Sequence, residues 1–159
     1  MGIGALVVLA VAAGIVWLQW GEHVELDGRI TAVRFHGVTE ADTVAMVDCE
    51  LKNPADVPFE VDEVEAVLQP PSGEPVTGAP VAVMDVPRLV EAYPALRGTG
   101  PAELGTLKAR DVIGPRQGSK RTLMFQFAAL KAADFEARKS LTVKIRERLG
   151  AVGVLKEAR

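Results

Sequence analysis

The sequence contains few of the residues from which catalytic and metal sites are built. Among 159 residues there are one cysteine, two histidines and three serines. A single cysteine excludes an intrachain disulfide. The chain has no G-x-S-x-G, no phosphate-binding P-loop, no G-x-G-x-x-G and no C-x-x-C. Because metal sites need several converging ligands, we expect no catalytic residue, no cofactor and no metal.

A strong net charge is also lacking. With 18 basic and 21 acidic residues the formal charge is -3, which gives no reason to expect nucleic acid as a partner. The hydrophobic content of 48% is too high for a disordered chain, and the charged content of 25% is too high for a polytopic membrane protein. The length suits one domain with a short appendage.

One long apolar run is present, at the start of the chain. Residues 3–20 read IGALVVLAVAAGIVWLQW, without a charged side chain. As a helix this run measures about 27 Å, close to the ~30 Å thickness of a bilayer's hydrocarbon core. Trp17 and Trp20 stand at its end, where indole rings favour the membrane interface. We therefore predict a transmembrane anchor over residues 1–21, with the lipid bilayer as its partner, and a juxtamembrane linker over 22–28.

Alternatives to a permanent anchor remain. A secretory signal could be cleaved near residues 10–12, although no Lys or Arg precedes that site. A buried core helix would need a larger protein around it, and Leu6 stands where a myristoylation motif has Ser or Thr. The first basic residue is Arg29, so the positive-inside rule has little to count. We choose the usual arrangement, with the domain on the extracytoplasmic side.

The following residues, 29–149, alternate with the two-residue period of half-buried strands and are interrupted by turn residues. Over residues 43–52, alternate apolar side chains share one face. Cys49 belongs to that face, so we interpret it as a small core residue and not as a nucleophile. Asn53 and Pro54 end the strand. We predict a β-domain over 29–149 and a tail over 150–159 with little to hold it.

Other patterns refine this prediction. The apolar phase slips at Asp62 and Glu63, which predicts a β-bulge. Residues 85–96 have helical spacing and predict a short inserted helix, with Asp85 capping its first turn. We expect further strands over 107–113 and 141–149, and a helical turn within 131–139. Six or seven short strands with regular turns indicate a mainly β fold, an antiparallel β-sandwich.

The stretch from Val47 to Pro54, continued by Val57–Val61 and 64–68, resembles the strand, Asn-Pro, strand pattern of LEA14-like (water-stress, WHy-type) domains. It is also similar to small Ig-like modules of bacterial envelope proteins, in which Gly-Ser precedes a late strand, as Gly118 and Ser119 do here. The resemblance covers roughly residues 29–147, and the insert at 85–96 departs from it. It implies an Ig-like β-sandwich, often membrane-tethered, without an established catalytic site.

Candidate chemical groups have simple structural interpretations. Glu22, His23 and Glu25 imitate ligand spacing, but a juxtamembrane polar cluster is the favoured interpretation. We expect His36 and Gly37 to form a turn after a strand ending at Phe35. The serines stand in turn-like contexts: Ser72, Ser119 and Ser140. The carboxylates of Asp62, Glu63 and Glu65 could act as an acid/base pair, but a solvated strand face is favoured.

The charge is unevenly distributed. Residues 1–104 carry 5 basic and 16 acidic side chains, whereas residues 105–159 carry 13 basic and 5 acidic ones. We favour cross-strand pairing of acidic early strands with basic late strands. The alternative is a basic face that meets anionic lipid or an acidic envelope protein. Its candidate residues are Lys120, Lys144, Arg146 and Arg148.

These observations predict a single-pass, membrane-tethered β-sandwich that acts as a binding or structural module of the cell envelope, without catalytic activity. An alternative function is that of a carrier or sensor, with a small apolar ligand bound between the sheets near residues 85–96. An enzyme is the third hypothesis, because no nucleophile and base are visibly paired.

Overall fold

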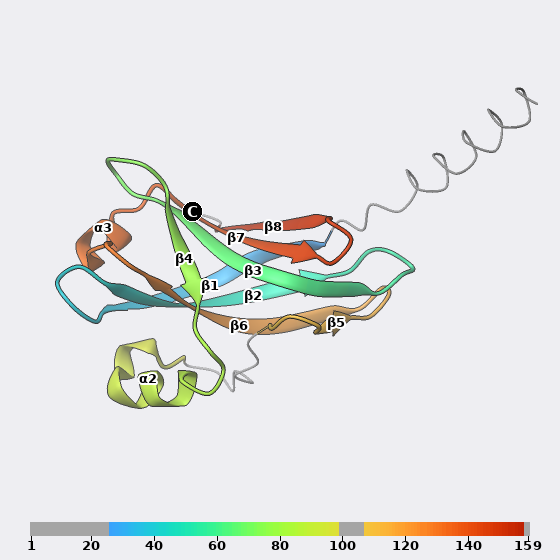
Figure 1. Cartoon of the computed structure of the whole chain (residues 1–159), viewed down its shortest axis with the longest axis horizontal. Coiled ribbons are helices and arrows are strands. Elements are labelled where there is room, and N and C mark those ends of the chain that lie inside the picture. Colours follow the sequence, from blue (N-terminus) through green and yellow to red (C-terminus); the bar gives the residue numbers. More distant parts are fainter. Residues whose placement is uncertain (1–25, 99–106, 158–159) are drawn as a thin grey trace, which may run out of the picture.

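The computed structural model describes residues 26–98 and 107–157, which form a mainly antiparallel β-structure (Figure 1). The helical elements are α2 (Val86–Ala92), η1 (Pro94–Leu96, a 3-10 turn) and α3 (Ala132–Glu136). The strands are β1 (Asp27–Gly37), β2 (Thr43–Lys52), β3 (Phe59–Gln69), β4 (Val76–Pro80), β5 (Val112–Ile113), β6 (Gly118–Phe127), β7 (Ser140–Glu147) and β8 (Val152–Lys156).

The predicted anchor, 1–21, lies outside the described residues, as do Trp17, Trp20, the polar cluster at 22–25 and most of the loop at 98–105. Within the part of the chain that the structure describes, no helix has the length and apolar character needed to span a bilayer.

The strands form one nearly closed sheet in the order β1-β2-β6-β4-β3-β7-β8, with β5 beside β3. Two groups of three strands, β1-β2-β6 and β3-β7-β8, are joined through β4, which pairs with β3 and then with β6. At the other side, β1 approaches the end of β8 through a parallel bridge between Ile30 and Glu157. The prediction of a mainly antiparallel β fold with a short helical insert is confirmed.

The main core lies between these two groups of strands. Its largest fully buried side chains include Phe59, Phe125, Phe127 and Phe135. The ring of Phe135, on α3, contacts Phe127 edge-on with ring centroids 5.4 Å apart. Helix α3, predicted as a helical turn within 131–139, therefore closes one end of the core.

The first half of β2 (residues 43–47) and the middle of β6 (residues 122–125) are buried on both faces. The predicted inner face of β2 is confirmed, since Ala45, Val47, Cys49 and Leu51 all belong to the main core. Val44 and Met46 point the other way, yet they are also buried, in a second cluster with Met124 of β6 and with Val86 and Leu96 of the insert. The α2–η1 insert thus covers the outer face of β2 and β6.

The predicted bulge in β3 is confirmed. The register between β3 and β7 shifts between Val61 and Glu63. A second bulge, which the sequence pattern did not indicate, lies in β1 between Ile30 and Ala32. Each bulge adds one residue on its strand, which increases the local bend and twist, as the curling of the sheet requires.

The expectation of a loosely held tail over 150–159 is wrong, and the β-domain does not end at residue 149. Residues 152–156 form β8, which pairs with β7 from Thr142 to Arg146. Leu155 is fully buried in the main core. The guanidinium of Arg138 donates to both carboxylate oxygens of Glu157, at 3.0 and 2.5 Å, in a largely buried ion pair. Apolar burial and this pair hold the segment in place.

Three smaller expectations also need correction. The strand expected over 107–113 is limited to Val112–Ile113, because a turn with the Asp111 N–H donating to the Lys108 carbonyl precedes it. Asp85 occupies the N-cap position of α2, but its side chain makes no capping hydrogen bond. His36 and Gly37 are the last residues of β1 and not a turn.

Candidate functional site

A cleft opens where β4 leaves β3 for β6. β4 pairs with β3 at Ala66–Leu68 and with β6 only at Phe125 and Gln126. From this crossing toward the start of β3, the described structure has no strand between β3 and β6. The next segment between them is the one that precedes β5. There the Val61 N–H donates to the Asp111 carbonyl at 2.8 Å, and the Arg110 N–H donates to the Val61 carbonyl at 2.7 Å. The opening is therefore bounded at both ends.

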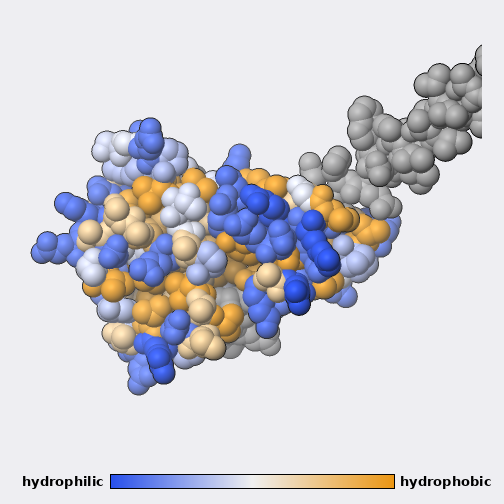
Figure 2. All heavy atoms as spheres, in the orientation of Figure 1, coloured by the Kyte–Doolittle hydropathy of each residue, from blue (hydrophilic) through white to orange (hydrophobic). Residues whose placement is uncertain are grey.

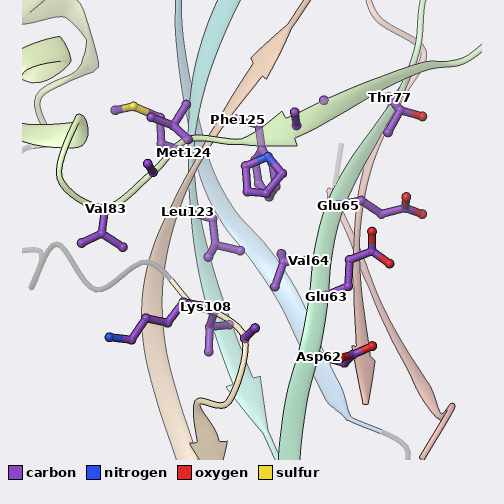
Figure 3. A pocket seen from close by; sticks show the side chains of 17 residues that line it. Asp62, Glu63, Val64, Glu65, Thr77, Val83, Lys108, Leu123, Met124 and Phe125 are labelled. Carbon is purple, nitrogen blue, oxygen red and sulfur yellow. The ribbon is translucent and has the colours of Figure 1, made fainter. Parts of the chain in front are cut away.

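The cleft has a volume of about 550 Å³ and a mainly apolar floor. Val64 of β3 and Leu123 of β6 point into the space between their strands, and Phe125 lies behind β4 (Figure 3). Pro80, the last residue of β4, and Val83, in the connection between β4 and α2, also line it. The volume lies in the range of small-molecule sites, which are mostly apolar with a few polar groups. The cleft is suited to an apolar group, and no nucleophile and base converge in it among the residues that the structure describes.

The three carboxylate residues considered as an acid/base pair or a solvated face border this cleft, but their side chains do not point into it. Asp62, Glu63 and Glu65 point to the other side of β3 (Figure 3). The carboxylate of Glu63 lies 2.9 Å from Arg146, and that of Glu65 lies 3.2 Å from Lys144. These two carboxylates are therefore engaged in separate cross-strand pairs with β7, an arrangement typical of a solvated strand face.

The four candidate basic residues are also paired with acids and do not form one face. Three of them lie on β7 or directly after it, and each is paired with a glutamate of β3: Lys144 with Glu65, Arg146 with Glu63, and Arg148 with Glu60. Hydrophilic residues gather over these two strands in Figure 2. Lys120 is on β6, which β4 and β3 separate from β7, and its ammonium lies 3.3 Å from Glu50 of β2. The acidic early strands thus lie beside basic late strands. Exposed pairs of this kind contribute little to stability.

The carboxylate of Glu50 forms ion pairs with two basic side chains. Arg29 donates to its carboxylate at 2.7 Å and Lys120 approaches at 3.3 Å. Hydrogen bonds from Arg29, and then from Lys120, lower the pKa of Glu50. Lys120 therefore shares the Glu50 carboxylate with Arg29.

A polar network that sequence reasoning did not find connects the insert to the sheet. Arg34 of β1 donates two hydrogen bonds to the carboxylate of Asp48, at 2.7 and 2.8 Å, and a third to the carbonyl of Leu96 in η1 at 3.0 Å. The Thr122 hydroxyl donates to the same carboxylate at 2.8 Å. The network fixes the position of η1 and has the character of a structural contact. The only signal of this network in the sequence is the opposite charge of Arg34 and Asp48 on two neighbouring strands.

Asn53 has a similar structural role. Its fully buried side-chain amide donates to the carbonyl oxygens of Val57, Ile113 and Gly114, at 2.8 to 3.2 Å, and its carbonyl oxygen accepts the Ala55 N–H at 3.0 Å. The predicted end of the strand at Asn53 is confirmed. The same side chain also joins the β2–β3 connection to the β5–β6 connection.

The remaining candidates lie in structural positions. Cys49 is buried, and loss of hydration together with the charge of Asp48 raises its pKa to about 12. The ring of His36 contacts that of Tyr93, with centroids 4.7 Å apart. The expected turn-like context is confirmed for Ser72, in the β3–β4 turn, but is wrong for Ser119, within β6, and for Ser140, the first residue of β7. No cluster of three or more potential metal ligands occurs among residues 26–98 and 107–157.

Comparison of the chain with protein-family models, with curated proteins and with solved structures finds no match.

Proposed function

We propose that this chain is a single-pass membrane protein whose β-domain acts as a binding or structural module of the cell envelope, without catalytic activity. The observation that carries the proposal is the uncharged run at residues 3–20, which is long enough for a bilayer and ends just before β1 begins at Asp27. The charges of β3 and β7 are consistent with it, because they pair with each other across the strands, as is typical of a solvated strand face.

The finer description of the domain belongs to the same proposal. We regard the nearly closed β-structure as an Ig-like sandwich of the LEA14-like (WHy-type) kind, with residue 26 near the membrane and the domain on the extracytoplasmic side. The position of Asn53 supports this, because the asparagine that ends a strand in the resembling pattern is here a buried contact between two connections.

Membrane fractionation of the full-length chain tests the anchor. We expect the wild-type chain to stay in the membrane after alkaline washing. The double variant Leu9→Arg/Ala12→Arg should move to the soluble fraction, because each charge at the centre of a spanning helix costs about 2.5–3.5 kcal/mol. Gly21→Arg, at the end of the run, is the matched control and should remain membrane-bound. A wild-type chain that is soluble after washing contradicts the anchor, and a mature mass lacking the first residues indicates cleavage.

Cysteine labelling tests the orientation. Glu74 is exposed in the β3–β4 turn, whereas the native Cys49 is buried. In intact cells, Glu74→Cys should react with a membrane-impermeant maleimide if the domain is extracytoplasmic. Labelling only after permeabilisation contradicts that side. The wild-type chain serves as the control for Cys49.

Anionic lipid is the first partner to test, and an acidic envelope protein is the second. In nanodiscs that contain anionic lipid, we expect Lys120 and Lys144 to be acylated more slowly by a water-soluble reagent than in neutral nanodiscs. The difference should decrease at high salt, because salt screens exposed charges. Equal acylation rates in both lipids remove anionic lipid as the partner of these residues.

The cleft between β3 and β6 favours a second candidate function, the binding of a small apolar ligand. The cleft adjoins the connection to the α2 insert, and Val64, Leu123 and Phe125 contribute to its wall. A photoactivatable alkyl probe should form adducts with peptides that contain these residues. Leu123→Trp should reduce those adducts by filling the opening. Adducts confined to residues 3–20 would show that the probe follows the lipid and contradict a ligand site.

A further inference from the structure

The described chain begins at one end of the β-structure. Leu26 is 3% exposed and packs against β8, where a Cβ on Gly153 would lie 2.7 Å from the Cβ of Leu26. The connections β2–β3, β5–β6 and β7–β8 lie at this same end (Figure 1). Their backbones are joined, because the Asn53 N–H donates to the Gln117 carbonyl and the Arg148 N–H donates to the Glu60 carbonyl. We call this end, formed by residues 53–58, 112–118 and 147–152, the entry end.

The entry end exposes apolar side chains. Leu149 is the most exposed large hydrophobic residue in the described structure, at 89%, and Val112 and Val152 are 59% and 44% exposed. Val112 is paired with Glu60, whose carbonyl accepts the Arg148 N–H, so Val112 and Arg148 lie on opposite sides of the same residue of β3. In Figure 2, apolar residues reach the surface at the right-hand end of the molecule, the end at which the β2–β3, β5–β6 and β7–β8 connections lie in Figure 1.

The turn that presents Leu149 is well defined. The Glu147 N–H donates to the Ala151 carbonyl at 2.7 Å, and the Gly150 N–H donates to the Glu147 carbonyl at 2.9 Å. Gly150 has a φ of +100°, a conformation that glycine adopts without strain. Leu149 is therefore held at the apex of the β7–β8 hairpin, beside the exposed cation of Arg148. A leucine with a neighbouring arginine suits the boundary between lipid chains and headgroups, where Arg keeps its charged end in water.

The length of the chain outside the structure limits how far this end can lie from a membrane. Trp20 ends the apolar run, and Leu26 is six residues later. Six residues span at most about 20 Å when fully extended. If residues 3–20 cross the bilayer, the entry end is held within that distance of the lipid headgroups.

We propose that the tip of the β7–β8 hairpin is a lipid contact, with Leu149 inserted into the interface of the bilayer that holds residues 3–20 and with Val112 and Arg148 beside it. This inference rests on the proposed membrane anchor. It orients the domain: the entry end faces the membrane, and the β3–β4 turn is the distal end.

Depth measurements on the full-length chain in nanodiscs test this orientation. An environment-sensitive fluorophore is attached to Leu149→Cys, with Glu74→Cys in the β3–β4 turn as the matched exposed control. The two sites lie at opposite ends of β3, about 30 Å apart. We expect nitroxide lipids to quench the fluorophore at 149 several-fold more than at 74, and iodide to quench it several-fold less.

The outcomes separate this inference from the anchor itself. Equal iodide quenching at 149 and 74, in a chain that co-purifies with the nanodisc, overturns the lipid contact and leaves the anchor intact. Protection at 149 that depends on having two chains per nanodisc overturns it in favour of a second copy as the occupant. A chain that does not enter nanodiscs overturns the anchor, and the lipid contact with it.

Discussion

The side-chain amide of Asn53 donates a hydrogen bond to the carbonyl oxygen of Ile113 at 3.0 Å, across 60 positions of the sequence. Together with its bonds to Val57 and Gly114, this contact holds the β2–β3 and β5–β6 connections next to each other. The local sequence pattern identifies Asn53 only as the end of a strand. In the structure it makes long-range contacts at the entry end.

Replacement of Asn53 should destabilise the fold. Asn53→Ala leaves buried carbonyl groups without donors, which costs about 1–3 kcal/mol. Asn53→Asp should cost more, because a charged acceptor then faces three carbonyl oxygens. Urea denaturation of the full-length chain, followed by circular dichroism, measures both values. The exposed neighbour provides the control, since Lys52→Ala should change stability by less than about 0.5 kcal/mol. Equal stability of wild type and Asn53→Ala would contradict the role assigned to the amide.

The C-terminal strand should be necessary for folding. Leu155 is fully buried whereas Val154, its neighbour on β8, is 45% exposed. Leu155→Ala should lower the free energy of unfolding by about 2–5 kcal/mol, because it removes core contacts and leaves a cavity. Val154→Ala, measured in the same denaturation experiment, should have a much smaller effect. Similar losses for the two variants would mean that β8 is not packed as described.

Glu147 should make stability depend on pH. It is buried at the end of β7, and loss of hydration, reinforced by the charge of Glu60, raises its pKa. A carboxyl whose folded pKa lies above its unfolded pKa stabilises the fold fully below the unfolded value, and this contribution is lost as the pH rises through the folded pKa. Glu147→Gln should therefore be more stable than wild type at pH 7.

The difference in unfolding free energy between Glu147→Gln and wild type should decrease as the pH approaches about 4.5, the ordinary pKa of the group. Urea denaturation at both pH values measures it. Glu63→Gln, at a half-exposed position of β3, is the control for loss of a surface charge pair. If Glu147→Gln were less stable than wild type at neutral pH, the predicted sign of the difference in unfolding free energy would be wrong.

Cys49 should be inert in the folded protein. Its thiol is 1% exposed and its pKa is raised to about 12, so the nucleophilic thiolate is scarce at pH 8. Maleimide should label Cys49 only after denaturation, as measured by intact mass. Glu74→Cys should gain one label under native conditions and a second after unfolding. Rapid native labelling of the wild-type chain would show that β2 opens readily.

The local pattern of apolar residues predicts much of the strand structure but little of how distant segments pack together. The alternation of Ala45, Val47 and Cys49 predicts the inner face of β2, because only one face of a strand can meet the main core. The slip in apolar phase at Asp62 and Glu63 predicts the bulge for the same reason. Neither pattern indicates that Val44 and Met46 are covered by the α2–η1 insert, since that depends on packing between distant segments.

The C-terminal strand and the cleft illustrate the same limit. Residues 152–156 are few, and Gly153 interrupts their apolar pattern, so the pairing with β7 and the contact between Arg138 and Glu157 are visible only in three dimensions. The cleft results from the change of partner along β4, from Leu68 of β3 to Phe125 of β6. No local feature of the β4 sequence specifies that change.

The bridge between Ile30 and Glu157 also affects how copies of the domain behave when crowded in a plane. An open sheet ends in strands whose unpaired main-chain groups template the addition of another molecule, and molecules confined to a surface collide often. Here β1 and β8 shield each other. Within the described part of the chain, β3 and β6 have no strand between them beside Val64, so we expect this opening to be one place where a neighbour's backbone adds when copies are crowded.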